Sequence, residues 1–419
     1  MREKKSGKKN FRFDGFHFLV RLALFLPVSV GLGFVGGWPK PVFAHSLRGF
    51  VAGEARLFTN PALQSEQENH EFSGVAAPEY YHEFDDGSLF TLVPFYRQDS
   101  VDSQRTHFDL REFTLVVPRD GWELRLGVRK VFWGVTETQH LVDIINQTDL
   151  VESPDLEEKL GQPMINLSID REWGTLDFFY MPFFRERTFP GRRGRLRLPL
   201  VVDTGQTAFE SPSKEWHTDI AFRYFNTIGK WDIGLSEFVG TGREPSFRLG
   251  LNNDGNLVLT PLYEQINQTG LDVLFVEDNW IWKLEVIHRN GQGNEDFFAW
   301  IGGFEYTFSG LAGRGMDLGV LGEWSFDDRE DESSNPLQND LTAGLRFAFN
   351  DVEGTEILIA LVQDLKRETR SFFIEASSRL TDHWRLTFEF RALFDQPLDD
   401  PGFALRDDDF FQVELAYHF

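Results

Sequence analysis

The 419-residue sequence contains no cysteine, which excludes disulfide bonds and thiolate chemistry. Basic residues are scarce: 42 Lys and Arg stand against 66 Asp and Glu, and the net charge of −24 excludes a general nucleic-acid binder. Beyond the first 44 residues there is no long apolar run that could form a transmembrane helix. Aromatic residues are abundant instead, with 43 Phe, 11 Trp and 8 Tyr in a chain of negative mean hydropathy.

Residues 1–44 are typical of a secretory signal peptide. Six basic residues lie in Arg2–Arg12, the apolar run Phe18–Val35 is interrupted by one charge, Arg21, and the sequence predicts cleavage before His45. The alternative is an uncleaved inner-membrane anchor, which the charge, a proline and several glycines within the run disfavour. Cleavage would remove eight Lys and Arg and two Asp and Glu, so the net charge would change from −24 to −30.

The last nine residues alternate strictly between an apolar face and a face of Gln, Glu, Ala and His. A soluble sheet would leave the edge of such a terminal strand uncovered, whereas a closed barrel has no edge. The pattern therefore predicts a transmembrane β-barrel that ends on an aromatic residue. The apolar face of this predicted assembly strand consists of Phe411, Val413, Leu415, Tyr417 and Phe419.

The same alternation recurs in Trp122–Arg129, Leu341–Phe349 and Trp384–Phe394. Charged side chains occupy the second face of these segments. That face must be wet, because lipid costs roughly 2–4 kcal/mol for each Arg or Lys at mid-depth. The predicted pore-lining residues are Glu123, Arg125, Arg129, Glu323, Arg346, Arg385, Glu389, Arg391 and Glu414.

Short turns alternate with long polar stretches along the chain. The expected short turns are Pro118–Gly121, Trp173-Gly174, Asn226–Gly229, Glu277–Asn279, Asn350–Gly354 and Thr381–His383, with a further hairpin at Asp86-Gly87. The long stretches are Gly134–Gln162, Thr188–Glu215, Thr241–Thr260, Asp328–Asn339 and Asp395–Asp409. This spacing predicts about eighteen antiparallel strands, with sixteen as the alternative, joined by short periplasmic turns and long extracellular loops.

A soluble β-sandwich or propeller would share the alternation and the turns. It would rarely place Trp at strand ends, where a membrane barrel has an aromatic girdle. Four tryptophans open a strand directly after a short turn: Trp122, Trp231, Trp280 and Trp384. We therefore expect an all-β fold, a single transmembrane barrel over residues 45–419.

On these features the chain resembles the Gram-negative outer-membrane porin-type β-barrels. Its last strand resembles the recognition strand by which such proteins reach the barrel assembly machinery. Gly127–Glu152 is also similar to a tract in a proteobacterial outer-membrane family of poorly defined function, where Trp-Gly precedes spaced Asp, Asn and Asp. That family more often has Pro after the Asn, where this chain has Gln147. The resemblance implies an outer-membrane location and identifies no substrate.

Four groups of polar residues lie in or beside the long stretches. The spacing of His140–Leu150 predicts a short helix, whose polar stripe would face the pore, a cation or extracellular solvent. Clustered arginines predict an anion site, for a permeant solute if their loop folds inward and for lipopolysaccharide phosphate if it folds outward. The acidic clusters Asp327–Glu332 and Asp407–Asp409 are expected to be solvated loop tips. The arginines are Arg185, Arg187, Arg192, Arg193, Arg195 and Arg197.

The histidines lack a recurring partner motif, so we expect no enzymatic activity, no cofactor and no metal site. The predicted function is an outer-membrane channel for small hydrophilic solutes, with anionic solutes as one option. The alternatives are a non-conducting scaffold for adhesion or assembly, with its lumen plugged by long loops, and an export conduit coupled to an inner-membrane pump. Expected partners are the outer membrane, lipopolysaccharide, the barrel assembly machinery and small solutes, and the oligomeric state is left open.

Deletion of Phe419 tests the assignment of the terminal strand. We expect misfolded protein in the periplasm and a loss of folded barrel, because the strand loses its terminal aromatic residue. The measurement is the fraction of protein with heat-modifiable gel mobility. Normal barrel yield after the deletion would contradict the assignment.

Overall fold

The structure, a computed structural model, describes residues 45–293, 295–311, 313, 315–330, 333, 335 and 337–419. The predicted signal peptide lies outside these residues. Within the described ranges the chain forms β-strands and short 3-10 turns, and none of its helices is long and apolar enough to cross a membrane. The all-β prediction is confirmed.

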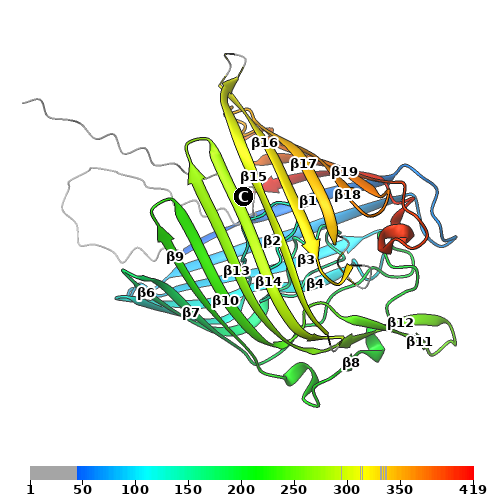
Figure 1. The fold of residues 1–419 in the computed structure, drawn as a ribbon, viewed down its shortest axis with the longest axis horizontal. Helices are drawn as coiled ribbons and strands as arrows, with labels where there is room; N and C mark the ends of the chain where they lie inside the picture. Colours follow the sequence, from blue (N-terminus) through cyan, green and yellow to red (C-terminus); the bar gives the residue numbers. More distant parts are fainter. Residues whose placement is uncertain are drawn as a thin grey trace, which may run out of the picture. The chain divides into compact units, whose positions relative to one another are not determined.

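Eighteen antiparallel strands form one closed sheet (Figure 1). Each strand pairs with its neighbours in chain order, and the sheet closes where β1 pairs with β21, for example at Gly53 and Leu415. The barrel strands are β1 (His45–Phe58), β2 (His70–Glu83), β3 (Leu89–Asp99), β4 (His107–Arg119), β5 (Trp122–Arg129), β6 (Gln162–Arg171), β7 (Gly174–Met181), β9 (Asp219–Ile228), β10 (Trp231–Thr241), β13 (Gln265–Glu277), β14 (Trp280–Gln292), β15 (Glu295–Leu311), β16 (Met316–Asp327), β17 (Asn339–Ala348), β18 (Glu356–Asp364), β19 (Arg370–Arg379), β20 (Trp384–Phe394) and β21 (Phe410–His418). The prediction of eighteen strands is confirmed.

The connections differ between the two ends of the barrel. At the end where β1 begins and β21 ends, the connections are short: 84–88, 120–121, 172–173, 229–230, 278–279, 312–315, 349–355 and 380–383. At the other end they are 59–69, 100–106, 130–161, 182–218, 242–264, 293–294, 328–338, 365–369 and 395–409. The two-residue connection between β14 and β15 is thus an exception at the long-loop end.

Two of the long connections form a small second sheet at the long-loop end. It consists of β11 (Ser246–Leu251), β12 (Leu257–Tyr263) and β8 (Ala208–Phe209). Three 3-10 turns complete the described loops: η1 (Thr204–Gln206), η2 (Lys214–Trp216) and η4 (Pro401–Leu405). The long connections are therefore folded elements with their own hydrogen bonds.

Side chains alternate between the outside and the inside of the barrel, as a period of two requires. On β21, Phe411, Val413 and Leu415 are 41, 41 and 39% exposed, whereas Glu414 between them is buried. Four strands begin with the tryptophans that the sequence placed after short turns, β5, β10, β14 and β20. The outer face of the barrel is therefore apolar, with aromatic rings at the short-turn end.

Gly127 on β5 shows how closely the strands approach. Its φ is +126°, and a Cβ atom there would lie 1.9 Å from the carbonyl oxygen of Phe113 on β4. We expect Gly127→Ala to reduce the folded fraction, because the backbone conformation alone costs about 1–3 kcal/mol for a residue with a side chain. Heat-modifiable gel mobility measures this fraction. Gly53→Ala is the control, because a Cβ at Gly53 meets no atom within 4 Å, and equal yields would contradict the prediction.

Candidate functional site

The connection between β5 and β6, residues 130–161, lies inside the barrel; we call it the inner segment. Val142 and Ile145 are 0% exposed and pack with Trp133. These three residues form an apolar cluster with inward side chains of seven wall strands, from β6 to β15. The cluster holds the inner segment against one side of the inner wall. The wall members of the cluster are Met164, Phe179, Met181, Ala221, Phe238, Ile266, Ile287, Phe297 and Ala299.

The helix expected over His140–Leu150 is not formed, so that prediction was wrong. The side chain of Asn146 accepts a hydrogen bond from the N–H of Val131 (2.8 Å) and donates to the carbonyl oxygens of Arg129 (2.9 Å) and Leu160 (2.8 Å). Thr148 forms an antiparallel bridge with Lys159. These contacts close the inner segment into a loop, and they join residues too far apart for local spacing to indicate.

Glu285 on β14 binds one part of the inner segment through its main chain. Its side chain is fully buried, and its carboxylate accepts hydrogen bonds from the N–H groups of Val135 (2.7 Å), Thr136 (3.1 Å) and Val142 (3.2 Å). The Thr136 hydroxyl donates to the same carboxylate at 2.7 Å. A buried carboxylate thus satisfies three main-chain donors in a region without secondary structure.

Glu323 on β16 binds the main chain of the next two residues of the inner segment in the same way. It accepts hydrogen bonds from the N–H groups of Glu137 (2.7 Å) and Thr138 (2.9 Å). The carboxylate of Glu137 in turn lies 2.7 Å from a guanidinium nitrogen of Arg346 on β17 and 3.6 Å from the ammonium of Lys283. Main-chain and side-chain contacts therefore attach Glu137 and Thr138 to three wall strands, β14, β16 and β17.

His140 adds a positive charge between two carboxylates. Its Nε2 lies 2.9 Å from Glu157, and its Nδ1 lies 3.8 Å from Glu285. Burial by itself lowers the pKa of His140, but the hydrogen bonds and charges of the two glutamates outweigh it and raise the pKa to about 10. His140 is therefore a cation at neutral pH, and it partly compensates the buried charge of Glu285.

The far part of the inner segment binds strands on the other side of the barrel. Asp149 lies 2.6 Å from Arg111 on β4, and Glu152 accepts a bidentate pair of hydrogen bonds from Nε and a terminal nitrogen of Arg97 on β3. Asp155 lies 2.9 Å from Arg391 on β20. In the closed strand order, β3 and β4 lie about half a circumference from β16. The inner segment consequently crosses the lumen and narrows it.

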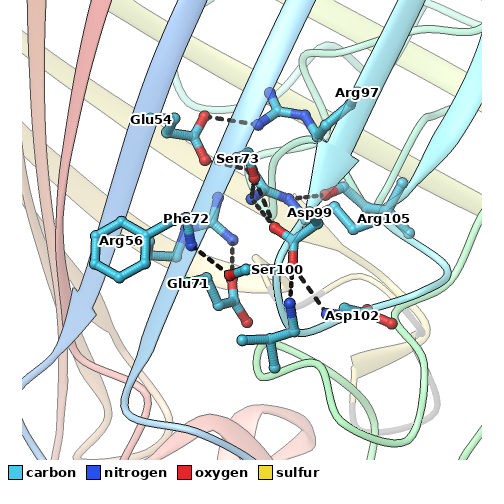
Figure 2. A network of polar contacts seen from close by, with 12 residues as sticks. Glu54, Arg56, Glu71, Phe72, Ser73, Arg97, Asp99, Ser100, Asp102 and Arg105 are labelled. Carbon is cyan, nitrogen blue, oxygen red and sulfur yellow. Dashed lines mark hydrogen bonds and ion pairs between the residues drawn. The ribbon is translucent and has the colours of Figure 1, made fainter.

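A buried ion network extends this attachment across β1, β2 and β3 (Figure 2). Glu54 on β1 lies 3.1 Å from Arg97 and 2.6 Å from Arg105, and Arg105 lies 3.1 Å from Asp99. All four side chains are at most 5% exposed. Because Arg97 also binds Glu152, the network is continuous with the inner segment. Opposite charges alternate within it, which compensates the cost of their burial.

The nine predicted pore-lining residues all lie on the strand face opposite the exposed apolar residues. The structure brings them together in small groups. Glu123 pairs with Arg125, and Arg125 and Arg129 both donate to the side-chain oxygen of Asn166 on β6. Glu389 and Arg391 form a second pair on β20.

Not all nine face open space. Glu323 and Arg346 bind the inner segment, and Glu414 is buried. Arg385 donates a hydrogen bond to Ser377 on the neighbouring strand. Glu285 was missed by the sequence reasoning, although it obeys the same signal: on β14 it alternates with the outward-facing Trp282, Leu284 and Val286.

The six predicted anion-binding arginines are not brought together. Arg195 is buried, lies 2.6 Å from Asp408, and its guanidinium stacks 4.3 Å from the ring of Phe58. Arg185 lies 2.7 Å from Asp109 on β4.

The other four arginines also have partners within the protein. Arg187 and Arg197 donate to backbone carbonyl oxygens. Arg192 and Arg193 are more than half exposed and lie 3.5 and 3.6 Å from the carboxylates of Glu66 and Glu68 respectively. The group mainly connects loops with one another, and the structure shows no shared anion pocket among these described residues.

The acidic clusters are only partly the solvated tips that we expected. Asp327 is 1% exposed and Asp408 is 7% exposed. Asp327 binds Arg329 at 2.6 Å and the hydroxyl of Ser333 at 2.8 Å, and Asp408 binds Arg195. The expectation was wrong for these two residues because basic partners distant in sequence or within the same loop cover them.

A closed barrel satisfies all strand hydrogen bonds without water, and this one has an apolar outer face and a charged inner face. An aromatic girdle marks its short-turn end. These features define the class: the chain is a transmembrane β-barrel of the bacterial outer-membrane type.

Comparison with known proteins assigns the chain to no family. No family model and no curated sequence matches the chain. Among solved structures, a mutant of the Rh. blastica porin shares 13% identity at a TM-score of 0.45, and a triple mutant of the Rhodopseudomonas blastica porin shares 12% at 0.43. A structure described as "Asymmetric conductivity of engineered proteins" shares 11% at 0.44. Each match covers 90% of this chain and 100% of the other.

Glu285→Ala tests the attachment of the inner segment. The change leaves the buried N–H groups of Val135 and Thr136 without their acceptor, at about 1–3 kcal/mol for each unsatisfied donor. We expect faster tryptic cleavage at Lys130 and Lys159 in the folded barrel. Glu277→Ala, at an exposed short turn, is the control. Equal cleavage rates for the two variants would contradict the role given to Glu285.

Proposed function

We propose that the protein is an outer-membrane channel through which small hydrophilic solutes pass beside the inner segment. The observation that carries the proposal is a charged inner wall that water still reaches. Glu123 and Arg125 on β5 are 29 and 28% exposed, and Glu375 and Arg391 on β19 and β20 are 25 and 23% exposed. Unlike the buried ion network, these ionised side chains are partly exposed to water, so a wet path along these strands supports conduction.

The inner segment would set the width of this path. It fills the side of the lumen lined by β6 to β15, where its apolar cluster excludes water. Its charged residue Asp155 reaches Arg391 on the opposite side. A solute would therefore pass a constriction where acidic and basic side chains lie close together, and its size would matter more than the sign of its charge.

Anion preference receives little support from the arginine group. Arg195 is buried against Asp408, and the two most exposed members lie beside glutamates. Exposed loop charges are also screened within about 8–10 Å at physiological salt, so they contribute little at a constriction. We propose weak charge selectivity, set by the mixed charges of the inner wall.

The test is single-channel recording in a planar bilayer, with folding verified by heat-modifiable mobility. We expect discrete, roughly ohmic steps from the wild-type barrel. A variant in which residues 134–160 are replaced by a short Gly/Ser linker should give larger steps, because the constriction is removed. Glu277→Ala should match the wild type.

The same recordings separate the alternatives. A silent wild type with a conducting linker variant would show that the inner segment is a plug, which would favour the scaffold function. Silence of both folded proteins would contradict the channel proposal altogether.

A further inference from the structure

A polar patch lies on the outer wall of the barrel, where the other strands are apolar. It consists of Glu237 on β10, Thr269 on β13 and His288 on β14, which are direct neighbours in the strand register. The hydroxyl of Thr269 donates to the Glu237 carboxylate at 2.6 Å. The side chains before and after them, such as Phe238, Gln268 and Ile287, are buried inside the barrel, so the three polar groups face outward.

The neighbouring strands carry apolar side chains at the same level of the outer wall. In the same cross-strand row, Glu237 pairs with Phe222 on β9, which pairs with Phe178 on β7, and His288 pairs with Phe298 on β15. Phe178 and Phe298 are 44 and 43% exposed on the outer wall. Three consecutive strands therefore interrupt a row of phenylalanines with an acid, a hydroxyl and an imidazole.

The depth of the patch follows from the strand geometry. His288 lies eight residues from Trp280, the girdle tryptophan that opens β14 at the short-turn end. With a rise of about 3.3 Å per residue and a tilt of about 40°, the patch is about 20 Å above that girdle. The apolar band of such barrels is about 25 Å tall, so the patch lies within it. Lipid tails offer no hydrogen-bond partner for these groups, whereas a second protein surface does.

We propose that this patch is the contact surface between two copies of the chain in the membrane. The patch is self-complementary. Glu237 and His288 lie two strands apart, about 10 Å, on either side of Thr269. A two-fold axis along the membrane normal, passing near Thr269, would place Glu237 on the same side of the axis as the partner's His288, and His288 on the same side as the partner's Glu237. The two facing groups would differ in depth by about 6 Å, because the row is inclined with strands tilted by about 40°. Such an isologous contact closes as a dimer and gives each ionisable group a hydrogen-bonding group of the partner, in addition to the bond that Glu237 accepts from Thr269.

The same sector also provides room for a partner's side chains. Toward the short-turn end, beginning four residues along β13 and β14 from the patch, the outer wall contains a groove of about 520 Å³. Its floor is Gly302 and Gly322, which have no side chains, and its sides include Trp282, Phe304 and Trp324. Polar groups beside an exposed aromatic hollow are typical of a protein interface rather than of a uniform lipid-facing wall.

Thr269→Cys tests the proposal in the intact protein, because the chain has no other cysteine. After mild oxidation of native membranes we expect a disulfide-linked species of twice the monomer mass, since the axis passes near this position. Phe178→Cys lies on the same outer row three strands away and is the matched control, expected to stay monomeric. The experiment depends on membrane insertion and not on conduction, so it is independent of the channel test.

Charge exchange provides the second measurement. In the Thr269→Cys background, Glu237→His should reduce the dimer, because imidazole would then face imidazole. Adding His288→Glu should restore it. Cross-linking no stronger than in the Phe178→Cys control, cross-linking to a protein of another mass, or indifference to the charge exchange would each overturn the proposal. Heat-modifiable mobility confirms that every variant compared is folded.

Discussion

The closure of the sheet by β1 and β21 is the constraint on which the rest of the structure depends. A membrane offers no water to unpaired backbone groups, so a strand sheet can cross it only without an edge. Pairing of the first and last strands over Phe50–Phe58 and Phe410–His418 removes the last edge. It also separates two environments, an apolar outside and an inside where charge is tolerated. All later features of the protein follow from that separation.

Inside the barrel, the inner segment packs against both apolar and charged parts of the inner wall. Its apolar residues, such as Val142 and Ile145, find an apolar patch on one side of the inner wall. Its main-chain donors bind wall carboxylates, of which Glu285 is fully buried. Its acidic residues bind arginines of β3, β4 and β20. These attachments leave mixed charges along the remaining path, on which the proposed channel function depends.

On the apolar outer wall, polar side chains are exceptions that need a physical explanation. A polar group on the inner wall needs no special explanation, because water or the inner segment reaches it. Glu237, Thr269 and His288 on the outer wall do need one, because phenylalanines occupy the same row on the neighbouring strands. A contact with a second copy removes the conflict without changing the fold.

The sequence by itself determined the strands, their faces, their number and most of the turns. The reason is that side-chain alternation and turn formation depend on residues close together in the sequence. It also indicated inward residues such as Glu323 and Arg346, whereas Glu285 was missed although it follows the same alternation. Only the tertiary structure decided which loop enters the lumen and what it binds. Helical spacing misled over His140–Leu150, since Asn146 contacts Val131 and Leu160 instead of its local neighbours. Arginines that are close in sequence pair with different carboxylates for the same reason. These carboxylates belong to strands and loops that lie far along the chain.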